Sequence, residues 1–445
     1  MLRPMAQVVL PSSLRNLAGG PAEVEITASH LGALLTRLEV LYPDLRGRIL
    51  DETGAVRPHV NVFLNGERAG LAEPIRDADR VQVLPAISGG QEDAEVLVGT
   101  RKGLLVLRGP RGGPMEIAAR RFEGTPVEFA FRDRRTGVYL AAVTSWHFGP
   151  RVFLADDPTG EWEQSDGPMF PEDAGATVDR IWVVAGGEED GVVWAGVAPA
   201  ALFRSEDGGL TWQLNRGLWD VPDREKWQPG AGGLCLHSIC PWPGDPLKLA
   251  VGISAAGVWL SDDGGVSWRR GIDGLVPRYL PEEARADAVD LCVHNLHRCP
   301  LEPETLYLQF HGGVYRSDDA GSSWTSIGSG LPSDFGFPLA VDPEDPDRAF
   351  VVPLVSDQDR VPPEGKLRVY ETRDRGNSWR ALGSGLPESG AYHTVLRQAL
   401  GQDGKKPLGL YMGTEQGAVY GSSDGGATWR VVAEHLPPIY SVRPA

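Results

Sequence analysis

Apolar and polar residues alternate with two different patterns along the chain. In the N-terminal part, segments 7–10, 59–64 and 80–84 have the composition of short strands, and Asn65-Gly66 predicts a turn between the last two. Between the first two segments, apolar residues recur at helical spacing after Thr27 or Ser29, either of which can cap a helix: Leu31, Leu34, Leu35, Leu38 and Leu41. The predicted order of strand, helix and strands indicates a small α+β domain over residues 1–90.

From about residue 92 onward, the pattern becomes one of short apolar strands separated by polar turns. Segments 249–261, 306–317 and 410–422 each contain a strand that ends in small residues, a short loop and a second strand of the type Gly-Val-Tyr-Arg. Segment 96–108 has the same two strands and loop. Such repeated strand pairs favour an all-β repeat architecture over a helical one.

A polar turn follows most of these strand pairs, with the pattern Ser-x-Asp-x-Gly-x-x-Trp. The tryptophans of its copies are 50, 56, 56, 55 and 50 residues apart, about the length of one four-stranded propeller blade. Asp and Ser side chains bond nearby backbone N–H groups, and the Trp packs inward, so the turn is structural. The copies end at Trp162, Trp212, Trp268, Trp324, Trp379 and Trp429; the first has Thr159 in place of Gly, and the fifth begins with Thr372.

One unit without the turn and six units with it give seven repeats. Residues 439–443 can supply the missing innermost strand of the first repeat and so close the ring. We therefore expect an all-β seven-bladed β-propeller over residues 91–445. Residues 92–437 resemble the Asp-box (BNR-repeat) propellers found in sialidases, and the motif is specific for the fold rather than for a function.

The first ninety residues resemble the MoaD/ThiS family of sulfur carriers. The resemblance rests on Val-Asn-Val-Phe-Leu-Asn-Gly at 60–66, Asp-Ala-Asp-Arg-Val at 77–81 and the closing Pro-Ala-Ile-Ser-Gly-Gly at 85–90. It implies a ubiquitin-like β-grasp, and a tail, Gly89-Gly90, whose carboxylate is adenylated by a separate activating enzyme that uses ATP. The product is a thiocarboxylate or an isopeptide. Glycine suits this tail because a narrow enzyme channel admits a backbone without side chains.

Gly90 is not the last residue, because Gln91-Glu92-Asp93-Ala94 follow it. Its carboxylate is locked in a peptide bond, so activation requires a cut after Gly90. Two interpretations remain open. Either the chain is a precursor that a deubiquitinase-like zinc protease processes, or the β-grasp is an uncut docking module.

Charge and composition narrow the function classes. The formal net charge of −17 and the lack of a basic stripe argue against nucleic acid as a partner. The chain contains no run of 18 apolar residues, and its first twenty residues lack a signal-peptide pattern. We therefore expect a cytoplasmic protein that does not enter a membrane. The four cysteines are sparse and form no Cys-x-x-Cys pair, which predicts free thiols.

The propeller face opposite the repeated turns is the expected place for a ligand, which is either a small molecule or a protein. Its loops are rich in polar and aromatic residues. Two inner strands also carry Cys and His two apart, as Cys235-x-His237 and Cys292-x-His294, but adjacent inner strands are often too far apart to share a zinc ion, so we expect no metal. The candidate ligand residues are Arg101, Trp146, His147, His237, Arg278, Tyr279, His294, His311, Arg360 and His393.

The sequence therefore predicts a carrier precursor fused to a binding or scaffold propeller, with no intrinsic cofactor and no catalytic residues assigned. The alternative is a sialidase-like, carbohydrate-active or carbohydrate-binding propeller with the β-grasp as an uncleaved docking module. The propeller lacks the Arg-Ile-Pro phrase usual near the start of sialidases. A sialidase would also need three arginines, a Tyr–Glu pair and an Asp acid. Whether the chain is an enzyme is left open; if it is one, a glycoside hydrolase is expected.

Overall fold

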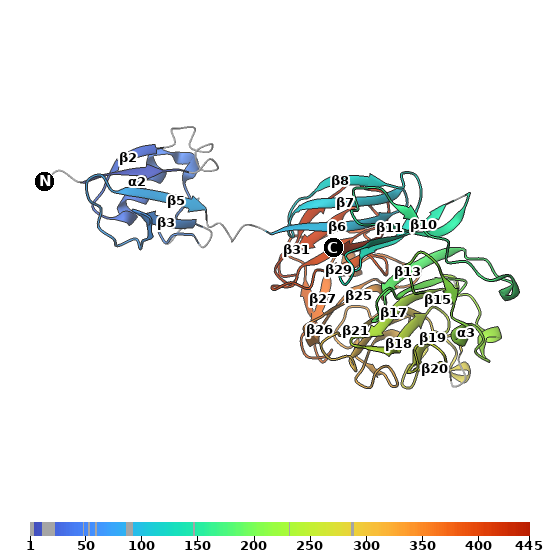
Figure 1. Ribbon diagram of the computed structural model, residues 1–445. Coiled ribbons are helices and arrows are strands. Elements are labelled where there is room, and N and C mark those ends of the chain that lie inside the picture. The colour runs from blue at the N-terminus through green and yellow to red at the C-terminus, as the bar shows by residue number, and fades with distance from the viewer. Residues whose placement is uncertain are drawn as a thin grey trace. The chain divides into compact units, whose positions relative to one another are not determined.

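The computed structural model describes residues 4–10, 23–47, 49–51, 54–57, 60–85, 92–145, 147–230, 232–285 and 289–445. The chain divides into two compact units, residues 1–92 and residues 93–445 (Figure 1). The predicted carrier tail, Gly89 and Gly90, and the candidate ligand residue Trp146 lie outside the described residues.

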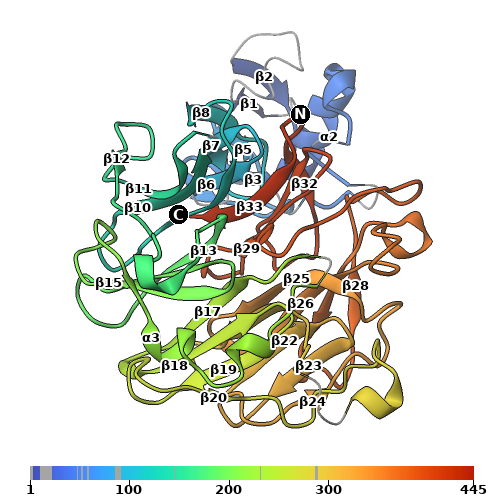
Figure 2. The same ribbon diagram turned by 90° about the vertical axis from the view of Figure 1, so that its right-hand side faces the viewer.

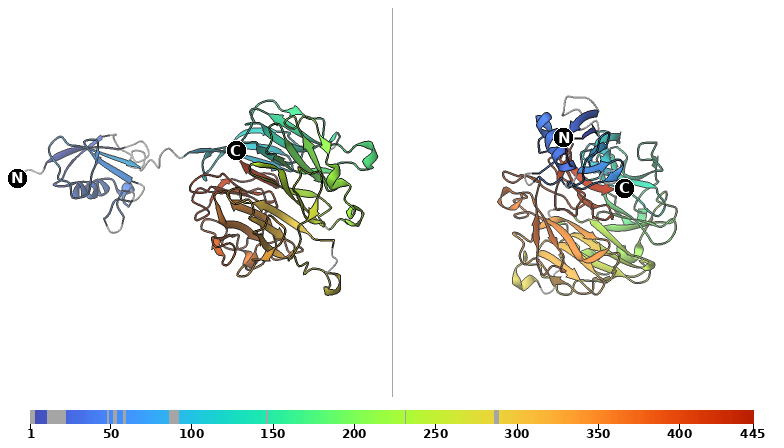
Figure 3. Two further views of the ribbon diagram at one scale, coloured as in Figure 1. Left: turned by 60° about the horizontal axis from the view of Figure 1, so that its bottom comes forward. Right: turned by 90° about the vertical axis from the view of Figure 1, so that its left-hand side faces the viewer.

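The first unit is a β-grasp, with one helix packed on a five-stranded mixed sheet (Figure 3, left). The strand order is β2-β1-β5-β3-β4, in which β1 and β5 are parallel and the other pairs are antiparallel. The strands are β1 (Met5–Val9), β2 (Glu23–Thr27), β3 (Val60–Leu64), β4 (Glu67–Arg68) and β5 (Arg80–Pro85). Helix α2 (Leu31–Leu41) buries Leu31, Leu34, Leu35 and Leu38, and a 3-10 turn, η1 (Pro43–Leu45), follows it.

Three details of this unit differ from the sequence expectation. The helix is capped by His30, whose side chain accepts from the Ala33 N–H, and not by Thr27 or Ser29. Leu41 is 58% exposed because the buried face ends one turn earlier. Strands β2 and β4 were not predicted, and the Asn65-Gly66 turn, with positive φ at both residues, joins β3 to β4 rather than to β5.

The second unit is built from four-stranded antiparallel sheets that follow one another along the chain. In the first three complete sheets, each strand pairs with the next in sequence. They are β9 (Val127–Arg132), β10 (Tyr139–Ser145), β11 (Gly149–Ala155) and β12 (Glu163–Gln164); β13 (Arg180–Gly186), β14 (Val193–Ala198), β15 (Ala201–Ser205) and β16 (Gln213–Leu214); and β17 (Leu236–Trp242), β18 (Asp245–Ile253), β19 (Gly257–Ser261) and β20 (Arg269–Arg270).

Three more sheets of the same kind follow. They are β21 (Val293–Arg298), β22 (Leu306–Phe310), β23 (Gly313–Ser317) and β24 (Thr325–Ser326); β25 (Gly336–Asp342), β26 (Asp345–Pro353), β27 (Val369–Thr372) and β28 (Arg380–Leu382); and β29 (Leu400–Gln402), β30 (Leu410–Gly413), β31 (Val419–Ser422) and β32 (Arg430–Ala433). In the described residues of the linking segments, the helical elements are short turns: α3 (Arg216–Trp219), η2 (Glu172–Ala174), η3 (Arg224–Lys226), η4 (Glu282–Ala284) and η5 (Pro363–Gly365).

The remaining sheet joins the two ends of the unit. It has the order β33-β6-β7-β8, with β33 (Ile439–Pro444) paired to β6 (Asp93–Thr100), followed by β7 (Gly103–Pro110) and β8 (Glu116–Arg121). The expected pairing of residues 439–443 with the first repeat is therefore present. First strands of successive sheets contact one another, and β33 contacts both β29 and β9. Strands β29 and β33 lie side by side in Figure 2. The contacts between first strands therefore form a closed cycle that runs from β9 through β29 and β33 back to β9.

The repeated turn has one hydrogen-bond pattern in its five best-kept copies. In the copy between β15 and β16, the Ser205 hydroxyl donates to Asp207 and accepts from the Gly209 N–H at 2.8 Å. Asp207 also accepts from the N–H and hydroxyl of Thr211 at 2.9 and 2.6 Å. Burial raises the pKa of Asp207, but these hydrogen bonds outweigh it and lower the pKa to about 2. It was not predicted from the sequence that the residue before the Trp is a hydrogen-bond partner of the Asp. This residue is Ser or Thr in all five copies: Thr211, Ser267, Ser323, Ser378 and Thr428.

No helix among the described residues is long and apolar enough to span a membrane. The four cysteines are free, as the sequence predicts.

Candidate functional site

A cavity of about 660 Å³ lies where the first strands of the second unit come together. Five of these strands contribute side chains: β9 with Glu128, β13 with Arg180 and Trp182, β21 with His294, β25 with Phe337, and β33 with Tyr440. Links between sheets supply the rest of the wall. The cavity is therefore built from residues that lie more than 300 positions apart in the sequence.

One wall of the cavity is a cluster of rings around two histidines. The centroid of the His311 ring lies 4.7 Å from that of Tyr279 and 5.2 Å from that of His294, both edge-on. Phe335 packs edge-on against both imidazoles at 5.2 Å, and Phe337 lies 4.7 Å from His294. Because each ring is held by its neighbours, the two imidazoles have little freedom to turn away.

Tyr279 ties this wall to the strand behind it. Its hydroxyl donates to the carbonyl of Asp290 at 2.9 Å and accepts from the backbone N–H of Cys292 at 2.8 Å. Burial raises the pKa of Tyr279 above its usual value. The tyrosine is therefore a neutral positioning residue that fixes the start of β21.

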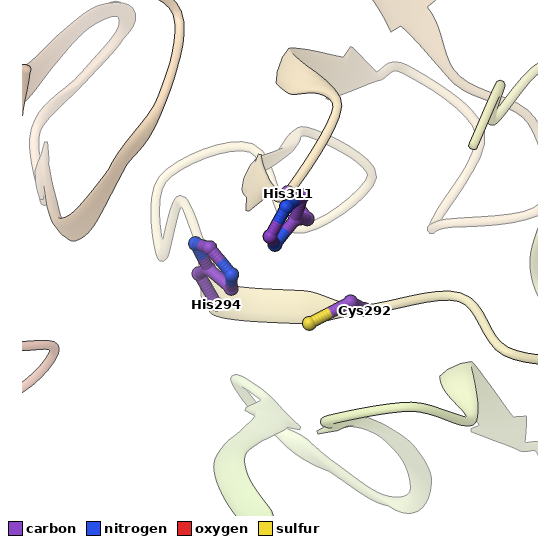
Figure 4. A group of neighbouring side chains, drawn as sticks. All are labelled: Cys292, His294 and His311. Carbon is purple, nitrogen blue, oxygen red and sulfur yellow. The ribbon is translucent and has the colours of Figure 1, made fainter. Parts of the chain in front are cut away.

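Cys292, His294 and His311 form a compact group on this wall. Cys292 and His294 lie two residues apart on one side of the chain, and His311 follows the neighbouring strand β22, where its N–H donates to the carbonyl of Cys292 at 2.9 Å (Figure 4). The sulfur and one nitrogen of each ring all lie within 4.8 Å of one another. Burial raises the pKa of Cys292 to about 11 and lowers the pKa of both histidines, so the group carries no net charge near pH 7.

Three guanidinium groups line the rest of the cavity. Arg180 pairs with Glu128 at 3.3 Å, whereas Arg360 and Arg397 have no carboxylate partner among the described residues. Arg397 instead lies 5.4 Å from the Trp182 ring and 5.1 Å from the Phe337 ring, and its buried Nε has no hydrogen-bond partner in the described part of the chain. A guanidinium held on aromatic faces and left unpaired is suited to an anionic ligand.

Carboxyl groups also reach the cavity, and burial perturbs three of them. It raises the pKa of Glu128 and of Glu415, against the opposing effects of Arg180 and Arg360, and it raises the pKa of Asp290. Asp357 lies beside His311 and acts to raise its pKa. Perturbed carboxyl groups in a cavity are a frequent mark of a functional site.

Four of the ten predicted ligand residues of the propeller line this cavity: Tyr279, His294, His311 and Arg360. The others lie elsewhere, except for Trp146, which is not described. Arg101 and His147 are exposed, Arg278 lies 3.7 Å from Asp334, and His393 is partly buried.

His237 does not line the cavity, and the Cys and His residues of two neighbouring strands do not form one cluster. The His237 ring is fully buried, with Nε2 bonded to the carbonyl of Val293 at 2.9 Å and Nδ1 to the hydroxyl of Ser238 at 3.0 Å. Cys235 contacts the Ser254 hydroxyl at 3.0 Å. Both His237 ring nitrogens are thus already engaged in hydrogen bonds within the core.

The sequence reasoning missed Glu128, Arg180, Trp182 and Arg397. Each lies on or just before the first strand of a sheet, where side chains of successive repeats face a common centre. Arg180 and Trp182 also alternate along β13, which places both on the same strand face.

Comparison with known proteins gives a clear result for the first unit. Residues 8–90 match the model of the ThiS family. The sulfur carrier protein CysO of Mycobacterium tuberculosis is 36% identical over 89 residues, which are 19% of this chain and 96% of that protein. The chain belongs to the ThiS family through its N-terminal domain. Small archaeal modifier protein 3 of Haloferax volcanii is also similar to the ThiS-family domain, with 41% identity over 64 residues, 14% of this chain and 68% of that protein.

Among solved structures, the comparison also finds a larger protein that aligns with most of this chain. An ancestral GH74 enzyme aligns with 79% of this chain and 40% of its own length, at 17% identity and a TM-score of 0.47. The chain is a ThiS-family, sulfur-carrier-like domain followed by a domain of four-stranded antiparallel sheets whose first strands contact one another in a cycle.

Proposed function

We propose that this chain is a carrier precursor, in which cleavage after Gly90 releases the ThiS-family domain for activation at its new C-terminus. The observation that carries the proposal is the match of residues 8–90 to the ThiS family, which ends at Gly90 itself. The similarity to a sulfur carrier protein over 96% of its length supports the same role. The domain boundary then falls at the cut, between residues 1–90 and 91–445.

The activation chemistry follows from a freed carboxylate. An adenylating enzyme joins the Gly90 carboxylate to the α-phosphate of ATP and releases pyrophosphate. A sulfur nucleophile then displaces AMP and leaves a thiocarboxylate, or an amine displaces AMP and leaves an amide conjugate. ATP is bound by that partner enzyme, and the partners are this enzyme and a processing protease.

The second unit acts in this proposal as a binding or scaffold domain, a seven-bladed propeller in which each four-stranded sheet is one blade. The cyclic contacts from β9 through β29 to β33 support the closed ring. The guanidinium groups of Arg360 and Arg397, which form no ion pair among the described residues, make an anionic small molecule the favoured ligand of the central cavity.

The intact mass of the protein recovered from its native host tests the carrier proposal. Under sulfur limitation, we expect a fragment of residues 1–90, part of it heavier by the difference between one sulfur and one oxygen atom. Recovery of the full-length chain alone under that condition would contradict a precursor and leave the ThiS-family domain as an uncut docking module.

A second candidate function is supported by the composition of the cavity. It brings together three arginines, two tyrosines and four carboxyl groups, the residue types that acidic-sugar hydrolysis uses: Arg180, Arg360, Arg397, Tyr279, Tyr440, Glu128, Asp290, Asp357 and Glu415. If the propeller is a glycoside hydrolase, a panel of fluorogenic glycosides that includes acidic sugars will show turnover. We expect the change Arg397→Met to reduce that turnover at least 100-fold, and the change of exposed His147 to Ala to leave it intact. No turnover across the panel would exclude this candidate for the sugars in it.

A further inference from the structure

We propose that Cys292, His294 and His311 bind one zinc ion, with a fourth coordination position open to the central cavity. The ligands are the Cys292 sulfur, Nε2 of His294 and one ring nitrogen of His311. This inference does not depend on cleavage after Gly90, because the three residues and the cavity belong to the second unit alone.

The geometry brings the right donor atoms together. The sulfur and one nitrogen of each ring lie within 4.8 Å of one another. Tetrahedral zinc, with Zn–S of about 2.3 Å and Zn–N of about 2.0–2.1 Å, places its ligand atoms roughly 3.5 Å apart. Small side-chain rotations that bring each atom inward by about 1 Å complete the site. The backbone bond between the His311 N–H and the Cys292 carbonyl, at 2.9 Å, fixes the two segments that carry the ligands.

The histidines are prepared for coordination. Nδ1 of His294 lies 2.6 Å from the carbonyl of Gly336, so it carries the proton and leaves the lone pair of Nε2 free. This hydrogen bond is the outer-shell contact that orients metal-bound histidines in general. The His311 ring has no hydrogen-bond partner among the described residues, and it is held only by the aromatic contacts with Tyr279, His294 and Phe335.

The three ligands differ from the other Cys and His residues of the inner strands. Both ring nitrogens of His237 are bonded within the core, and Cys235 and Cys240 contact Ser254 and Leu296. Cys292, in contrast, lines the cavity together with both histidines. Zinc favours thiolate and imidazole donors, and three protein ligands with one open position are typical of catalytic zinc sites rather than structural ones.

The surroundings indicate what completes the zinc sphere. Arg397 acts electrostatically on both Cys292 and His294, so a cation there is stabilised only if anions accompany it. The Cys292 thiolate is one such anion, since a coordinating thiol is deprotonated outright. The second anion is a ligand in the fourth coordination position, beside Arg397, whose buried Nε has no hydrogen-bond partner among the described residues.

Metal titration of the untagged full-length chain tests the site. We expect one zinc per chain by elemental analysis, and cobalt substitution should give a thiolate-to-cobalt charge-transfer band together with intense tetrahedral d–d bands. Azide should shift the d–d bands because it takes the open position. We expect Cys292→Ser to remove the charge-transfer band and His311→Ala to weaken zinc binding at least 100-fold.

Matched controls separate the site from adventitious binding and from misfolding. Cys299→Ser removes a buried thiol in the connection between β21 and β22, and His435→Ala removes a histidine ring that is 90% exposed. Neither change should alter the cobalt spectrum. Circular dichroism and the urea midpoint confirm that Cys292→Ser is folded. A wild-type chain that binds cobalt without a thiolate band, or that binds no cobalt, would overturn the proposal.

Discussion

Replacing Gly90 with valine is expected to abolish both release of the N-terminal domain and formation of a thiocarboxylate or conjugate. A branched side chain at the cut site blocks the narrow channel that a glycine tail enters, and it restricts the backbone conformations that glycine allows. In the native host, the variant should be recovered as the full-length chain by intact mass, under the sulfur limitation that yields the 1–90 fragment from the wild type.

Gly70→Ala is the matched control for this change. A Cβ built at Gly70 meets no atom within 4 Å, and Gly70 has no positive φ, so the substitution fits the folded domain. The control should be processed as the wild type is. If Gly90→Val released the fragment at the wild-type rate, cleavage after Gly90 would be wrong as the activating step.

Replacing Trp324 with alanine is expected to lower the free energy of unfolding of the second unit by about 3–5 kcal/mol. The side chain is 5% exposed, and its Nε1 donates to the carbonyl of Gly271 in the preceding sheet at 3.0 Å. The change therefore opens a core cavity and also leaves a buried carbonyl without this partner. Urea unfolding followed by tryptophan fluorescence measures it, because residues 1–90 contain no Trp and the signal reports the second unit alone.

Phe148→Ala provides the comparison for this measurement. Phe148 is an aromatic residue of the same unit that is 75% exposed, so its removal should change the stability by less than about 0.5 kcal/mol. A loss at Trp324 no larger than the loss at Phe148 would show that the tryptophans of the repeated turns do not hold neighbouring sheets together.

In the N-terminal domain, the sequence predicted the long elements better than the short ones. The helix and strands β1, β3 and β5 were found because their apolar residues are buried in a regular pattern. Strand β2 was missed, although Val24 and Ile26 alternate with polar residues. The predicted N-cap of the helix was wrong because the side chain of His30, a less common capping residue, accepts a hydrogen bond from the Ala33 N–H.

In the second unit, the repeated turn depends on residues close together in the sequence, whereas the cavity depends on residues far apart. The repeated turn could be predicted from local sequence, because its hydrogen bonds between Asp207 and Thr211 and between Ser205 and Gly209 lie within eight residues. The cavity could not be predicted in this way, because it forms only when distant strands pack together. Arg180, His311 and Arg397 meet there because β33 pairs with β6 and the first strands contact in a cycle. Contacts between residues so far apart in sequence depend on the packing of whole sheets, which spacing along the chain does not specify.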